Sequence, residues 1–173
     1  MIALPEIGAI PPEPETERRQ WLGRKLNGDG GRGRLLIIGC NPSTASAETN
    51  DPTISKEIKF ATRWGFDYLD KCNIFDWRST DPLALKKTAE PVSRINEAYI
   101  LSAASRCSMV LCAWGKNGAL QARGARTKRV LLGAGAALFY LRLNADGSPQ
   151  HPLYLPDDTE PKEWLAQSAR TGE

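Results

Sequence analysis

The sequence predicts an α/β fold in which a central, mainly parallel sheet of four strands lies between two layers of helices. The chain has 173 residues, the usual size of one domain, and 41% of them are hydrophobic and 25% charged, as in ordinary globular proteins. Short apolar runs alternate along the chain with segments of helical periodicity. Strands joined by helices form right-handed βαβ units, and such units build a three-layer α/β/α sandwich.

The chain is predicted to carry one domain flanked by two shorter segments. Residues 1–33 are assigned to an N-terminal arm and a short helix, residues 34–155 to the α/β domain, and residues 156–173 to a C-terminal tail or helix. The arm is expected over residues 1–16, which are rich in proline and alternate acidic with apolar residues. Such a composition is typical of an extended segment that lies over a surface.

The first elements are expected on either side of a glycine-rich turn. Thr16–Leu26 is predicted as a short helix with Trp21 and Leu22 facing inward, and the Asn-Gly-Asp-Gly-Gly run at residues 27–31 ends it. Leu35–Gly39 then begins the sheet, because a continuous apolar run bounded by glycines is typical of a strand buried on both faces.

Helices and strands alternate through the rest of the domain. Helical periodicity predicts three helices, at Ile54–Trp64, Arg94–Ser105 and Asn117–Leu132. Ser93 is the expected cap of the second helix. Apolar runs predict three more strands, at Phe66–Ile74, Ser108–Trp114 and Ala137–Leu141.

The residues that follow the predicted strands are the candidate site, because ligands bind beyond the carboxyl ends of the strands in parallel sheets. Polar, small and aromatic side chains occur at all of these places. They are Gly39, Cys40, Asn41, Pro42 and Ser43 after the first strand, Asn73 and Phe75 at the end of the second, Trp114 at the end of the third, and His151 after the fourth. We expect them to converge on one edge of the sheet.

The composition excludes several classes of site. His151 is the only histidine, so a three-histidine zinc site is excluded and any Cys-His or Ser-His catalysis must use that residue. The four cysteines form no Cys-x-x-Cys pair, and we expect neither a metal nor a cofactor. A net charge of +3 permits an anionic partner without requiring one.

The same features predict where the protein is found. The chain begins without a charged region followed by an apolar stretch, and its cysteine spacing suits reduced thiols, so a cytoplasmic location is expected. It also contains no apolar run long enough to cross a membrane.

Several motifs occur in an order that resembles a known family. They are Leu35–Ala45, Asp51-Pro52-Thr53, Trp64-Gly65, Asn73–Pro82, Trp114-Gly115 and His151–Tyr154. Over about residues 34–155 they resemble domain of unknown function 1643 (DUF1643), a family name that carries no activity. The chain is more distantly similar to the uracil-DNA glycosylase superfamily, whose members place Gly-x-(Asp or Asn)-Pro after the first strand and His-Pro near the end.

The resemblance to the glycosylases implies roles for individual residues. Asn41 takes the position that holds or orients the attacking water in the mismatch-specific branch. His151 takes the position of the histidine that stabilises the departing base as an anion. Asn73 resembles the asparagine that reads the Watson–Crick edge of the base, because an amide presents both a donor and an acceptor. Phe75 or Phe60 would stack on an extruded base.

The predicted function is the binding of a nucleobase, nucleotide or short single-stranded nucleic acid, with hydrolysis of an N-glycosidic bond as the enzyme hypothesis. A non-catalytic nucleotide- or nucleic-acid-binding module is one alternative, and a structural or interaction domain that keeps only the fold is another. The segment His151–Leu155 continues as an apolar stretch without a wedge loop. A short single strand is therefore favoured over an invaded duplex.

Local structural roles are the alternative interpretation of each candidate. Asn41 before a proline suits a turn, Asn73 suits a strand end, His151 suits an exposed loop, and Trp114 suits packing between sheet and helix. Two carboxylates are either acid–base groups or caps and ion-pair partners, and four basic side chains either contact phosphates or form a solvated helix face. They are Asp51, Asp76, Arg123, Arg126, Lys128 and Arg129.

Overall fold

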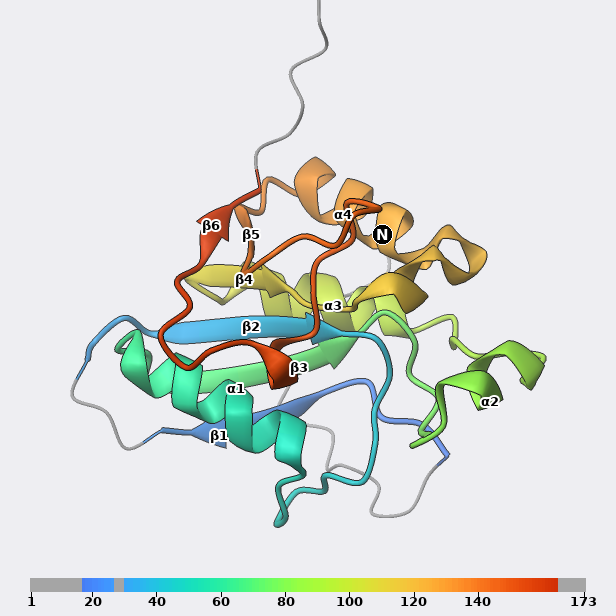
Figure 1. The fold of residues 1–173 in the computed structure, drawn as a ribbon, viewed down its shortest axis with the longest axis horizontal. Coiled ribbons are helices and arrows are strands. Elements are labelled where there is room, and N and C mark those ends of the chain that lie inside the picture. Colours follow the sequence, from blue (N-terminus) through green and yellow to red (C-terminus); the bar gives the residue numbers. More distant parts are fainter. Residues whose placement is uncertain (1–16, 27–29, 165–173) are drawn as a thin grey trace, which may run out of the picture.

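Six strands form one mixed sheet in the part of the chain that the computed structural model describes, residues 17–26 and 30–164. They are β1 (Leu22–Lys25), β2 (Arg34–Gly39), β3 (Tyr68–Asn73), β4 (Met109–Cys112), β5 (Leu138–Tyr140) and β6 (Lys162–Glu163). Their order across the sheet is β1-β3-β2-β4-β5-β6 (Figure 1). The four central strands are parallel to one another, whereas the edge strands β1 and β6 pair antiparallel with β3 and β5.

The sheet is therefore wider than the four strands predicted, and both edges were missed. The helix predicted for Thr16–Leu26 is wrong over its described residues, because β1 lies there and pairs with β3. Gly23 weakens a helix at this place, and the free edge of β3 supplies main-chain hydrogen bonds that a short isolated helix cannot match. At the other edge, β6 lies within residues 156–173, the segment assigned to a tail or helix, and pairs with β5. Residues 1–16 and 165–173, which include the predicted arm, lie outside the described residues.

Helices and 3₁₀ turns connect the strands. Within the described residues they are α1 (Pro52–Arg63), α2 (Pro82–Lys87), α3 (Asn96–Ser105), η1 (Lys116–Ala122), α4 (Arg123–Gly133) and η2 (Pro152–Tyr154). Helix α1 packs on one face of the sheet, and α3 and α4 pack on the other (Figure 1). None of these helices is long and apolar enough to cross a membrane.

Strand β2 lies at the centre of the core. Leu35 and Ile37 pack with Phe60 of α1 in one apolar cluster, and Leu36 and Ile38 belong to the cluster on the opposite face. All four β2 side chains are fully buried. The predicted strand with two buried faces is confirmed.

Two helix predictions need correction. Ser93 does not cap α3, because its hydroxyl donates to the carboxylate of Asp76 and the capping residue of α3 makes no side-chain hydrogen bond. The helix predicted for Asn117–Leu132 breaks at Gln121 and Ala122, whose φ angles of 50° and 51° are left-handed. The 3₁₀ turn η1 therefore precedes α4. Helix α2 was not predicted at all.

Candidate functional site

A cleft of about 440 Å³ lies beyond the carboxyl ends of β2, β3 and β4. This volume is within the range of roughly 300–1,000 Å³ that is usual for small-molecule sites. In Figure 1 the orange-red segment that leads into η2 passes in front of β2, and the turn η2 lies in front of β3. His151, the residue just before η2, lines the same cleft. The cleft brings together most of the predicted site residues, namely Gly39, Cys40, Asn41, Ser43, Asn73, Trp114 and His151.

Phe75, Phe60 and Pro42 were expected at the site, but none of them lines the cleft. Phe75 is fully buried in the apolar cluster under α3 and α4, and Phe60 stacks on Trp64 with ring centroids 5.1 Å apart. Neither phenylalanine lines the cleft, so the prediction that one of them stacks on a base is wrong. Pro42 is also buried and contributes a carbonyl group that orients Asn41.

Trp114 forms a wall of the cleft mainly by packing. Its side chain is 4% exposed, and a Cβ atom on Gly118 or Gly124 would overlap the indole. The indole therefore fills the space that these glycines leave between η1 and α4. Its ring centroid lies 5.9 Å from that of Trp164. The packing role foreseen for this tryptophan is confirmed.

The side-chain amide of Asn41 is oriented by two main-chain carbonyl groups. Its Nδ2 donates to the oxygen of Ser79 at 2.8 Å and to that of Pro42 at 3.1 Å. These two acceptors fix which end of the amide is nitrogen. Its Oδ1 is therefore the atom that can accept a hydrogen bond from water or a ligand in the cleft.

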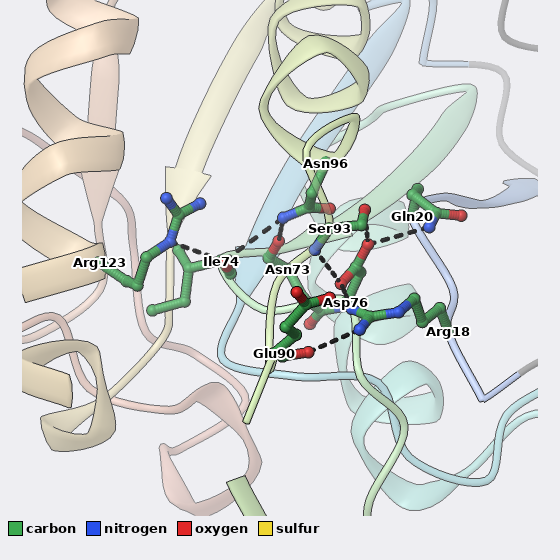
Figure 2. Close-up of polar contacts among 9 residues, drawn as sticks. All are labelled: Arg18, Gln20, Asn73, Ile74, Asp76, Glu90, Ser93, Asn96 and Arg123. Atoms are coloured by element: carbon green, nitrogen blue, oxygen red, sulfur yellow. Dashed lines mark hydrogen bonds and ion pairs between the residues drawn. The ribbon is translucent and has the colours of Figure 1, made fainter. Parts of the chain in front are cut away.

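Asn73 presents a buried amide at the end of β3. The residue is 2% exposed, and its side chain makes no hydrogen bond within residues 17–26 and 30–164. Side chains of α3 and α4 hold the main chain at this strand end (Figure 2). Asn96 donates to the carbonyl oxygens of Asn73 at 2.9 Å and Ile74 at 3.4 Å. Arg123 also donates to the carbonyl oxygen of Ile74, at 3.2 Å. Because Asn73 lines the cleft, its amide is available to a ligand there.

Asp76 anchors the chain after β3. Its fully buried carboxylate accepts hydrogen bonds from Arg18 Nη1 at 2.8 Å, Gln20 Nε2 at 2.9 Å and the Ser93 main-chain nitrogen at 2.9 Å (Figure 2). The ion-pair alternative is confirmed for this residue, with Arg18 as its partner. The segment before β1 is thereby tied to the strand end that carries Asn73.

His151 is an uncharged imidazole at neutral pH. Burial and, to a smaller extent, the nearby charge of Lys71 lower its pKa to about 4, against an opposing effect of Asp51. Its Nδ1 accepts a hydrogen bond from the main-chain nitrogen of Leu153 at 3.3 Å. The proton of the neutral ring is therefore on Nε2, which makes that atom a hydrogen-bond donor.

A buried ion pair at the cleft was missed by the sequence analysis. Lys71 Nζ lies 2.5 Å from Glu57 Oε1, and the two side chains are 5% and 0% exposed. Burial raises the pKa of the Glu57 carboxyl, while Lys71 opposes this shift. The signals were present, because Glu57 lies one turn after Ile54 on the apolar face of α1, and Lys71 follows Asp70 in a strand that is buried from Leu69 to Asn73.

Gly39 leaves the space in which the floor of the cleft is built. A Cβ atom at this position would lie 2.7 Å from Lys71 Nζ and 2.8 Å from Asn73 Oδ1.

Gly39→Ala is therefore expected to displace both groups and to lower the free energy of unfolding by about 1–3 kcal/mol, as overpacking usually does. Urea denaturation measures this loss. The control is Gly133→Ala, because a Cβ at Gly133 meets no atom within 4 Å; equal stability of the two variants would contradict the expectation.

Asp51 and Cys40 line the cleft without being poised for acid–base or nucleophilic chemistry. Asp51 caps α1, since its Oδ1 accepts from the Ile54 nitrogen at 2.8 Å and its Oδ2 from the Ala45 nitrogen at 3.4 Å. The cap predicted as one of its alternatives is confirmed. Burial raises the pKa of the Cys40 thiol to about 12. In the described part of the chain, no group of three or more His, Cys, Asp and Glu residues is placed to hold a metal ion.

The basic residues of α4 do not form one phosphate-binding face. Arg126 pairs with Glu97 at 2.8 Å, and Lys128 lies over the ring of Trp164, 3.7 Å from its centroid. Arg123 is buried against the end of β3. Their positive charges are thus directed to different partners.

Comparison with known proteins gives one match. The family described as "Protein of unknown function (DUF1643)" matches residues 18–153, a span that begins before β1 and includes every residue of the cleft lining except Tyr154. No curated protein and no solved structure matches the chain. Because the matched span is more than half of the sequence, the chain belongs to the DUF1643 family.

Proposed function

We propose that the cleft binds a nucleobase, presented by a nucleotide or a short single strand, and that an N-glycosidic bond is hydrolysed there. The observation that carries this proposal is the Asn73 amide, which lines the cleft at 2% exposure with no hydrogen-bond partner in the described part of the chain. A side-chain amide offers a hydrogen-bond donor and an acceptor, and it can therefore pair with an acceptor and a donor that lie side by side on the edge of a base. The end of β3 therefore suits base recognition.

Asn41 and His151 supply the groups for hydrolysis. In the proposed reaction, Asn41 Oδ1 accepts a hydrogen bond from a water molecule and orients its oxygen toward C1′ of the sugar. The C1′–N bond breaks and its electron pair stays on the base, whose carbonyl oxygen accepts a hydrogen bond from His151 Nε2. The water oxygen bonds to C1′, and its proton passes to the departing base. An oxocarbenium-like state needs no strong general base.

The proposal extends to fold and location. The placement of α1 on one face of the sheet and of α3 and α4 on the other supports a glycosylase-like three-layer sandwich. The four free cysteines are in keeping with a cytoplasmic location.

Hydrolysis is tested with oligonucleotides that contain uracil, thymine mismatches or modified pyrimidines, as single strands and as duplexes, together with free nucleotides. The expected result is the formation of abasic sites or free base, faster on single strands, and its loss in Asn41→Ala. No product from any substrate would overturn the catalytic part of the proposal while leaving base binding open to its own test.

Base binding is tested through Asn73. Asn73→Ala is expected to weaken nucleotide affinity about 10- to 100-fold, because a site that loses its hydrogen-bonding amide loses roughly 1–3 kcal/mol of discrimination. Calorimetry or a ligand-dependent shift in melting temperature measures the change. Asn144→Ala is the control, since the side-chain amide of Asn144 donates to Ser148 in a turn outside the cleft. Unchanged affinity in a folded Asn73→Ala protein would refute the assignment.

A binding module without catalysis is the second candidate, and one observation favours it. Both oxygens of Asp51, a carboxylate that lines the cleft, accept main-chain hydrogen bonds, so Asp51 is not placed as a general base. Glu57 is fully buried outside the cleft lining and pairs with Lys71. Nucleotide binding that depends on Asn73 but yields no product would select this candidate.

A further inference from the structure

Two guanidinium groups meet beside the cleft. Arg19 Nη1 and Arg78 Nη2 both donate to the carbonyl oxygen of Ala45, the latter at 2.8 Å. Neither arginine takes part in an ion pair with a carboxylate in residues 17–26 and 30–164. Arg19 is 8% exposed and lines the cleft, whereas Arg78 is outside the cleft lining and reaches the site through the shared carbonyl oxygen of Ala45. A buried positive charge at this place therefore faces the cleft without a dedicated counter-ion.

The local charges leave this positive charge only partly balanced. Burial, followed by the charge of Arg78, lowers the pKa of Arg19 to about 10, and Asp51 and Glu57 oppose the shift. At neutral pH Arg19 is still protonated. Both acidic groups are engaged elsewhere, Asp51 in capping α1 and Glu57 with Lys71.

Hydrogen-bonding capacity is also left over. Arg19 Nε is buried without a partner in the described part of the chain, which is costly for a charged donor. The side chains of Ser43 and Thr80 line the same cleft and form no hydrogen bond among the described residues. A guanidinium fork together with hydroxyl groups is a set of donors suited to the oxygens of a phosphate.

We propose that Arg19 and Arg78, with Ser43 and Thr80, form a phosphate subsite at the side of the cleft bounded by residues 40–51. This inference rests on the proposed function, because the phosphate belongs to the nucleotide whose base lies at Asn73. It specifies the ligand as a nucleotide, in preference to a free base or a nucleoside. The segment before β1 thereby supplies a binding residue as well as an edge strand.

Paired ligands test the subsite. Calorimetry compares uridine, thymidine, cytidine, adenosine, guanosine and inosine with their 5′-monophosphates, and inorganic phosphate is the third probe. For the base that binds, the 5′-monophosphate is expected to bind at least ten-fold tighter than the nucleoside, and this advantage should shrink as salt is added. Arg19→Gln and Arg78→Gln should each reduce the advantage and leave nucleoside affinity unchanged. Arg142→Gln is the control, because Arg142 is exposed and outside the cleft.

The outcomes separate this inference from the proposed function. Equal affinity for nucleoside and nucleotide would overturn the phosphate subsite and leave base binding intact. If no nucleoside or nucleotide binds, the proposed function fails, and the subsite is then decided by inorganic phosphate, whose stabilisation of the protein must be lost in Arg78→Gln. Should Arg19→Gln not fold, Arg19→Lys keeps the charge but not the planar fork and is expected to lose part of the nucleotide advantage.

Discussion

Replacing Glu57 with alanine is expected to lower the free energy of unfolding by about 3–5 kcal/mol, the usual cost of removing one partner from a buried ion pair. The loss is large because Lys71 would remain 5% exposed without its counter-charge, whose oxygen lies 2.5 Å from Nζ. Urea denaturation followed by circular dichroism measures the change, with the slope of the transition checked for constancy.

Two further variants separate the loss of charge compensation from the loss of packing. The double variant Glu57→Leu/Lys71→Met keeps similar volume without either charge, and we expect it to recover most of the stability. Glu160→Ala removes the ion-pair partner of Arg63, which like Glu57 lies on α1. The Glu160 side chain is 61% exposed and that of Arg63 is 42% exposed. This variant should therefore cost less than about 1 kcal/mol. A Glu57→Ala loss as small as that of Glu160→Ala would show that the buried pair contributes little.

The central part of the fold follows from local signals. The apolar run of β2 predicts a strand with two buried faces. The helical periodicity of the segment predicts α1, and a cap at its start is one of the two roles expected for Asp51. The two edges do not follow in the same way. Strand β1 contains Gly23 and two basic residues and exists because β3 offers a free edge, while β6 pairs over only two residues. Such strands depend on a neighbour that local sequence does not reveal.

The candidate site was predictable where it depends on topology alone. Parallel strands bring their carboxyl ends to one edge, so Asn41, Asn73 and His151 were expected near one another and do line one cleft. The direction of a side chain after a strand ends is not set by alternation, and Phe75 accordingly turns into the core. Pairings across distant segments were also beyond local patterns, as with Arg19 and Arg78, which meet at one carbonyl oxygen.

Protein stability below pH 6.5 is expected to fall more steeply in the wild type than in His151→Gln. The pKa of His151 is lowered from 6.5 to about 4 by burial and by Lys71. The stability that this group contributes is fully present above pH 6.5. Between pH 6.5 and 4 the unfolded chain binds a proton that the folded protein does not, so the free energy of unfolding of the wild type should fall by about 3 kcal/mol more than that of the variant by pH 4. Urea titrations at several pH values measure it.

The imidazole can also be observed directly, since His151 is the only histidine and its ring proton resonances in an NMR titration need no assignment. We expect a midpoint near pH 4 in the wild type and a higher one in Glu57→Leu/Lys71→Met, because the Lys71 charge helps to lower this pKa. A wild-type midpoint near 6.5 would mean that the ring is well solvated and becomes a cation in mild acid. The proposed chemistry requires the opposite: a neutral ring whose Nε2–H donates a hydrogen bond to the departing base at every pH between about 5 and 8, so that titration of His151 adds no pH dependence to the activity in that range.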